Sequence, residues 1–168
     1  MERDEERRLL QEIVGAFEAA TGRTPRGWLG PALTSTENTI DVLAELGFDY
    51  TLDWANDDQP YLMKTSSGRL ASVPYSSEVN DIPAFVLRHH TGEQFAEAVI
   101  DQFEVLYEEG ANSLRVLGIG IHPFLVGQPF RAKHFERALE HIAGRDDVWL
   151  TTSDEIATWY LEATSSGA

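Results

Sequence analysis

The chain has 168 residues, with 28 acidic and 13 basic side chains, so its formal net charge is −15 when the five histidines are neutral. Hydrophobic residues make up 42% and charged residues 24%, as in folded globular proteins. The negative charge argues against nucleic acid or an anionic membrane surface as a partner, because it repels phosphates. The absence of cysteine excludes disulfides, thiolate catalysis and cysteine-ligated zinc.

No apolar run approaches the roughly 18 residues of a membrane span. The first residues are charged and helical in pattern, unlike a signal peptide. We therefore expect a soluble chain, with the cytoplasm as its default location.

The N-terminal third predicts two helices around a short strand. Apolar residues recur at helical spacing before a stop at Thr21-Gly22, namely Leu10, Ile13, Val14 and Phe17. A short apolar stretch at residues 27–29 follows. Thr34 and Glu37 have the spacing of a capping box, which predicts a second helix running to about Gly47.

Strands and loops dominate the middle of the chain. Residues 48–54 are aromatic and β-branched, which predicts a strand, and residues 56–60 form a polar loop after it. Residues 61–63 and 70–74, separated by Ser66-Ser67-Gly68, predict a hairpin or two short strands. A long loop at residues 75–83 follows.

The C-terminal half alternates helices with apolar runs. Thr91 and Gln94 form a capping box before a helix that ends at Gly110. Residues 116–121 predict a strand that ends in His122-Pro123. A helix containing Phe135, Leu139 and Ile142 comes next, then a short strand at residues 148–150 and a terminal helix capped by Ser153.

This alternation predicts a parallel sheet covered by helices, with active-site groups in the loops after the strands. About four strand–helix units follow an initial helix, as though the chain entered an α/β barrel midway, since a full barrel takes about 250 residues. We expect one domain over residues 1–163 and a flexible tail at residues 164–168.

Five segments in order carry a family resemblance. They are Gly27-Trp28-Leu29-Gly30-Pro31, Leu43-Ala44-Glu45-Leu46-Gly47-Phe48, Asn56-Asp57-Asp58-Gln59-Pro60-Tyr61, Val73-Pro74-Tyr75 with Asn80-Asp81, and Ile121-His122-Pro123. Together they resemble the polysaccharide deacetylase family of the NodB-homology type. The Asn-Asp-Asp and Pro-Tyr…Asn-Asp segments are most similar to the branch that contains the deacetylase-like allantoinases.

The resemblance implies an α/β fold, the C-terminal half of a distorted (β/α) barrel of the glycoside hydrolase/deacetylase type. Family members hydrolyse non-peptide C–N amide bonds, in N-acetylated carbohydrates or a ureide ring, and complete members use a divalent metal of the zinc type. The resemblance places the metal-binding Asp and histidine pair upstream of Met1. It also places Leu29 where many members carry an arginine that orients the catalytic Asp, with Arg26 close by.

The remaining histidines do not predict a metal site. His89 and His90 are adjacent, and His134 and His141 are seven residues apart on one predicted helix. Such side chains diverge instead of converging on one ion. We therefore expect no cofactor in this chain alone, and no activity from it alone.

His122 is the candidate catalytic residue. By resemblance it matches the family histidine that protonates the leaving amine as general acid. Its place at the end of an apolar strand in an α/β fold also favours a ligand site. A structural histidine that bonds a loop is the alternative.

The candidate substrate-binding residues are Trp28, Trp54, Asp57, Asp58, Asn80, Asp81 and Arg131. Asp53, Asp57 and Asp58 could form paired carboxylates for proton transfer, although an Asx turn is at least as consistent with the sequence; the same alternatives hold for Glu78, Asn80 and Asp81. The tryptophans could flank a sugar or ureide, or could belong to the core. Arg131 could close over the site, or could start a helix and pair with an acid such as Glu136.

Two functions remain open. In one, the chain is part of an amide hydrolase that is active only when an upstream polypeptide completes the barrel, since an open barrel exposes sheet edges and apolar faces. In the other, it is a non-catalytic remnant that folds, with a homodimer as one option, and binds a small polar ligand or nothing.

Overall fold

The computed structural model describes residues 1–165 and divides the chain into two compact units. The first consists of Met1–Val73 together with the chain from Thr151 onward, and the second of Pro74–Leu150. Two residues of the predicted tail, Thr164 and Ser165, are helical, and residues 166–168 lie outside the described part. No helix within residues 1–165 is both long enough and apolar enough to cross a membrane.

The first unit contains a four-stranded sheet of order β1-β2-β4-β3. β1 (Gly27–Trp28), β2 (Tyr50–Thr51) and β4 (Ala71–Ser72) are parallel, and β3 (Tyr61–Leu62) pairs antiparallel with β4. The predicted parallel sheet and the predicted hairpin are thus both present. The strand predicted over residues 48–54 is shorter than expected.

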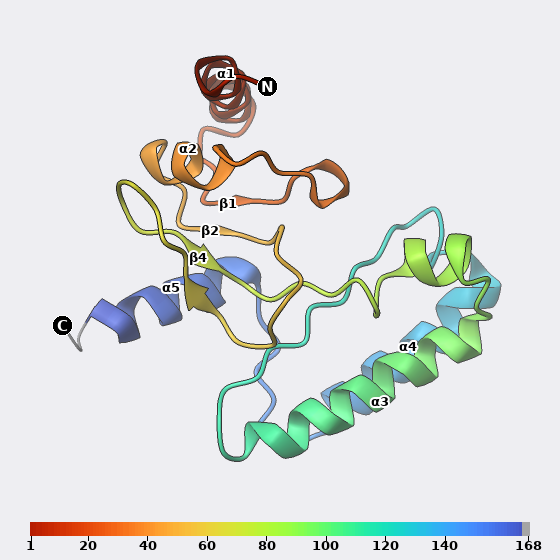
Figure 1. Cartoon of the computed structure of the whole chain (residues 1–168). Helices are drawn as coiled ribbons and strands as arrows, with labels where there is room; N and C mark the ends of the chain where they lie inside the picture. Colours follow the sequence, from red (N-terminus) through yellow and green to blue (C-terminus); the bar gives the residue numbers. More distant parts are fainter. Residues whose placement is uncertain (166–168) are drawn as a thin grey trace. The chain divides into compact units, whose positions relative to one another are not determined.

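Helices cover both faces of this sheet (Figure 1). α1 (Arg3–Thr21) and α2 (Thr39–Glu45) lie on one side, where Leu10, Val42 and Leu43 share a core cluster. α5 (Ser153–Ser165) lies on the other side, where Ala157 packs with strand residues. Gly22 ends α1 with a φ of 68°, a left-handed conformation that suits glycine.

Two predicted helix caps are wrong. α2 starts at Thr39 rather than just after Thr34, whose hydroxyl donates to the carbonyl of Pro31, the first residue of a short 3₁₀ helix (Pro31–Leu33). α5 is capped by Thr152 rather than Ser153. The Glu155 N–H donates to the Thr152 hydroxyl at 3.3 Å, and the Glu155 carboxylate accepts from the Thr152 N–H at 3.2 Å. A capping box needs a glutamate three residues on, which Thr152 has.

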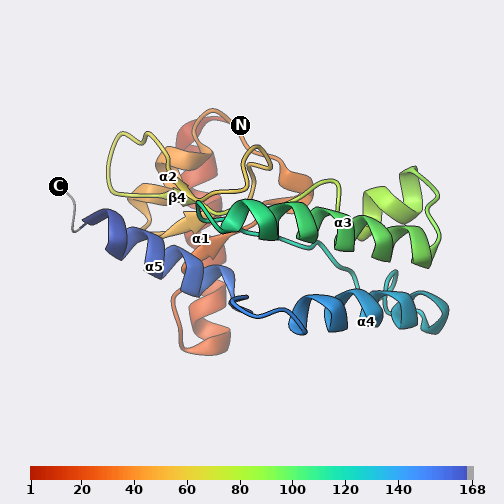
Figure 2. The ribbon, with the colours of Figure 1, turned by 90° about the horizontal axis from the view of Figure 1, so that it is seen from below.

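The second unit consists of a π-helical turn (Pro83–Leu87), α3 (Gly92–Gly110) and α4 (Pro129–Ala143). The predicted capping box at Thr91 and Gln94 is confirmed. α3 and α4 lie side by side (Figure 2). Their shared core cluster contains Phe95, Val99, Phe103, Ala138 and Ile142.

Neither strand predicted for this unit forms as expected. Residues 116–121 make a single parallel bridge, between Gly120 and Asn80, and residues 148–150 form no strand. A strand is defined by ladder pairing, and an apolar run predicts burial without supplying a paired neighbour. The mixed α/β class is nevertheless confirmed.

Candidate functional site

The second unit pairs a buried carboxylate with a half-buried histidine. Asp81 is 0% exposed, and its Oδ1 lies 2.6 Å from His122 Nδ1. Its Oδ2 accepts the backbone N–H of His122 at 2.7 Å and that of Val126 at 3.3 Å. One aspartate therefore fixes both the ring and the backbone of His122.

Backbone bonds around one bridge bring these two residues together. The Asp81 N–H donates to the Gly120 carbonyl at 2.9 Å, and the Gly120 N–H donates to the Val79 carbonyl at 3.1 Å. The Asn80 side-chain amide donates to the Tyr75 hydroxyl at 3.0 Å. A Cβ on Gly120 would lie 2.5 Å from that amide nitrogen, so this close approach requires glycine.

The pairing defines which ring nitrogen of His122 can act on another molecule. A carboxylate accepts and does not donate, so the bond assigns the proton to Nδ1 and leaves Nε2 unengaged by Asp81. The His122 side chain keeps 34% of its surface exposed. His122 is thus held in one orientation with Nε2 available for proton transfer.

Asp81 cannot contact a substrate as the sequence analysis expected, because both its oxygens are bonded inside a fully buried site. Asn80 is also buried, and its side chain bonds Tyr75 and the Ile82 N–H. Both residues support His122 and its loop. Sequence reasoning named Asp81 and His122 separately and missed their contact.

The loop after His122 is tightly folded. The N–H groups of Leu125 and Val126 both donate to the His122 carbonyl, at 2.8 and 3.1 Å. Arg131 donates from Nη1 to the Leu125 carbonyl at 3.3 Å. The ring of Phe124 contacts the imidazole edge-on, with centroids 5.7 Å apart. Phe124 therefore contacts the His122 ring, and Leu125 links the His122 backbone to the Arg131 guanidinium.

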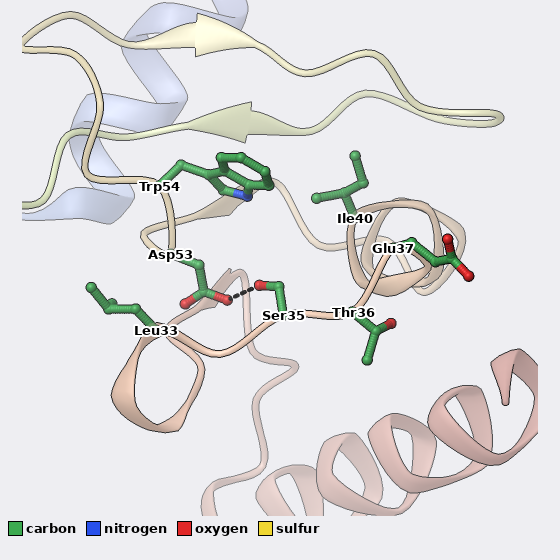
Figure 3. A pocket seen from close by; sticks show the side chains of 7 residues that line it. All are labelled: Leu33, Ser35, Thr36, Glu37, Ile40, Asp53 and Trp54. Carbon is green, nitrogen blue, oxygen red and sulfur yellow. Dashed lines mark hydrogen bonds between the residues drawn. The ribbon is translucent and has the colours of Figure 1, made fainter. Parts of the chain in front are cut away.

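The first unit contains an open pocket of about 480 Å³ (Figure 3). Asp53 and Trp54, which follow β2 after one intervening residue, form one side of the pocket. The rest of its lining comes from the segment before α2 and from the start of that helix, namely Leu33, Ser35, Thr36, Glu37 and Ile40. The Asp53 carboxylate accepts the Gly30 N–H at 2.6 Å and the Ser35 hydroxyl at 3.0 Å. Trp54 is exposed, as a ligand-stacking residue must be.

The other predicted binding residues of this unit lie outside the pocket. Trp28 is half-buried, and its ring meets Phe48 edge-on at 6.1 Å, as in the core alternative. Asp57 accepts the Gln59 N–H at 2.9 Å, the geometry of an Asx turn. Asp58 is exposed and lies in the same loop.

Arg26, which lies close to Leu29 in sequence, bonds two residues of the first unit. Its Nε donates to Asp49 at 2.7 Å and its Nη2 to Thr158 at 2.9 Å. The hydrogen bond to Asp49 raises the pKa of Arg26.

The residues present do not fit a metal ion. Within residues 1–165, no three His, Asp or Glu side chains group as ligands. His141, one of the two histidines on α4, contacts Glu104. No step of the chemistry below is therefore assigned to a metal held by these residues.

No protein-family model matches the sequence. A Schizosaccharomyces pombe protein, whose name assigns it to the polysaccharide deacetylases, is 31% identical over 169 residues, which cover 88% of this chain and 52% of that protein. A Helicobacter pylori peptidoglycan deacetylase is 25% identical over 195 residues, covering 94% of this chain and 64% of that protein. The chain thus spans one half to two thirds of the length of these relatives.

Two crystal structures are similar over 96% of this chain, each with a TM-score of 0.87. One is a probable polysaccharide deacetylase from Pseudomonas aeruginosa PAO1, 33% identical and covered over 55% of its length. The other is the PuuE allantoinase, 31% identical and covered over 54%. The fold is therefore that of the deacetylase-type α/β proteins. More narrowly, the chain is a partial match to the polysaccharide deacetylase family, and the resemblance found in its sequence is confirmed.

Proposed function

We propose that the chain provides the proton-transfer side of the active site of an amide hydrolase that cleaves non-peptide C–N bonds. The observation that carries this proposal is the bond between buried Asp81 and half-exposed His122. Similarity to proteins named as deacetylases and as an allantoinase supports the reaction class.

In this proposal His122 acts as the general acid. Water adds to the amide carbonyl and gives up one proton to the surrounding water, and the C–N bond of the resulting tetrahedral species breaks with its electron pair on nitrogen as the carbonyl re-forms. The leaving nitrogen takes a proton from His122 Nε2, because an unprotonated amide anion is a poor leaving group. Asp81 keeps the ring in one orientation while it does so.

The substrate is proposed to be an N-acetylated carbohydrate or a ureide. The exposed indole of Trp54 offers an apolar face for such a ring, next to the bonded carboxylate of Asp53. Asp57 and Asp58 are further candidates for contact, since both are exposed. These assignments, and a cytoplasmic location, stay predictions.

The test is hydrolysis of allantoin and of N-acetylated chito-oligosaccharides, with and without Zn²⁺, Mn²⁺ or Co²⁺. A chimaera in which this chain replaces the matched half of the PuuE allantoinase is assayed alongside the chain itself. His122→Ala should abolish hydrolysis, whereas His134→Ala, a histidine of the same unit outside the pair, should leave it unchanged. Hydrolysis that survives His122→Ala would refute the proposal.

A polypeptide partner remains part of the proposal. Leu9, Ile13 and Phe17 form an exposed apolar stripe on α1, and β1 is an edge strand of its sheet. A parallel edge strand with a neighbouring apolar helix face is the surface that a further strand would cover. Alternatively, a second copy of this chain covers the same surface. Light scattering after size-exclusion chromatography distinguishes a monomer from such a dimer.

A further inference from the structure

Arg131 is held in place by two aromatic rings. Its guanidinium carbon lies 4.3 Å from the ring centroid of Phe85 and 5.0 Å from that of Phe130. Its Nη1 donates to the Leu125 carbonyl. Stacking and one hydrogen bond fix the plane of the group, so little rotamer entropy remains to be lost when it binds a ligand.

The guanidinium has no carboxylate partner within residues 1–165. In this acidic chain seven other arginines lie within 4.0 Å of a carboxylate, namely Arg3, Arg7, Arg8, Arg26, Arg115, Arg137 and Arg145. Arg131 is half-buried and still carries donors beyond the one that Leu125 uses. Arg131 is therefore a fixed guanidinium that has no carboxylate partner among the described residues, and it is available to bind the anionic group of another molecule.

The same loop joins Arg131 to His122. Leu125, whose carbonyl accepts from Arg131, donates its own N–H to the His122 carbonyl. Gly127 follows closely in this loop, and a Cβ there would lie 2.3 Å from the Pro123 carbonyl oxygen. The loop is therefore compact, and Leu125 links the backbone of the proposed general acid to the guanidinium.

We propose that Arg131 binds a carboxylate of the substrate, so that among the amides of the proposed function those that carry a negative charge are favoured. This inference rests on the proposed function, because it concerns the site of His122. A guanidinium forms two parallel bonds to a carboxylate, which makes it selective for that group over a neutral one.

The test compares two small probes of similar size, N-acetylglycine, which ends in a carboxylate, and N-acetylglycinamide, which ends in a neutral carboxamide. Each is titrated into ¹⁵N-labelled chain, and the amide signals of residues 122–131 are followed by NMR. We expect the anionic probe to bind about tenfold more tightly than the neutral one, through charge-assisted hydrogen bonds.

Arg131→Met keeps an unbranched side chain against both rings but removes the charge, so it should abolish the difference between the probes. Arg88→Met is the matched control, since Arg88 is an exposed arginine of the same unit and its Nη1 donates to the Glu78 carbonyl at 3.5 Å. It should keep the difference.

Equal affinity of the two probes for the wild-type chain would overturn the proposal. So would a preference that survives Arg131→Met, or signal changes confined to other residues. No hydrolysis is measured here, and His122→Ala should retain the preference. Failure of this inference is therefore separate from failure of the general-acid role.

Discussion

Replacing Asp81 by Asn changes one atom at the centre of the candidate site. In the wild-type chain Oδ2 accepts two backbone N–H groups and Oδ1 accepts the proton of His122 Nδ1. An asparagine keeps one acceptor and places an NH₂ at the other position. Its oxygen should face the two N–H groups, because an NH₂ there would leave both donors unsatisfied.

In that orientation the NH₂ faces His122 Nδ1. The ring can then accept a bond only if Nδ1 loses its proton, so the neutral imidazole should move its proton to Nε2. The two backbone bonds persist but lose their charge assistance, at a cost of about 1 kcal/mol each. Asp81→Asn should therefore lower the free energy of unfolding by about 2 kcal/mol.

Long-range ¹H–¹⁵N NMR of the histidine rings near pH 9, where imidazoles are ordinarily neutral, reports the tautomer. Urea denaturation gives the free energy of unfolding. Asp57→Asn is the control, because Asp57 is exposed and bonds only a turn N–H. A variant that keeps the wild-type tautomer and stability would show that Asp81 does not hold His122.

Three further changes test the surroundings of the site and the helix pair. Gly127→Ala should destabilise the chain by about 2 kcal/mol in urea, because the new Cβ would meet a backbone oxygen at 2.3 Å, whereas Gly110→Ala, with nothing within 4 Å, should not destabilise it. The pKa of Glu104 is lowered, chiefly by its hydrogen bond from Arg145, so Glu104→Gln should reduce stability near pH 7. A pH series in urea should show that deficit closing as the pH falls below the ordinary value of 4.5; a constant deficit would contradict the assignment. Burial raises the pKa of Tyr75 above its ordinary value of 10.0, so folding loses stability as the pH rises past 10.0, and Tyr75→Phe should lose less, as followed by circular dichroism.

Local sequence patterns predicted most of the helices. The capping box at Thr91 and the glycine stop at Gly22 depend on residues within one turn of the helix end, which is why they were predictable. The prediction of a strand at residues 116–121 was wrong, because strand pairing depends on a neighbour that is distant in sequence. An apolar run indicates that a segment is buried, and it does not indicate which segment lies beside it.

The candidate site likewise has one part that local sequence predicts and one part that depends on a contact between distant residues. His122 could be named from its position after an apolar run, whereas the role of Asp81 depends on a contact between residues 41 apart in sequence. The contact does not need the long strand that was predicted, since the single bridge between Asn80 and Gly120 already fixes the Asp81 backbone. Each further bond from Asp81 goes to the ring or the loop of His122. The geometry of the pair is therefore set by one bridge and one carboxylate, and a substitution at either should disturb His122.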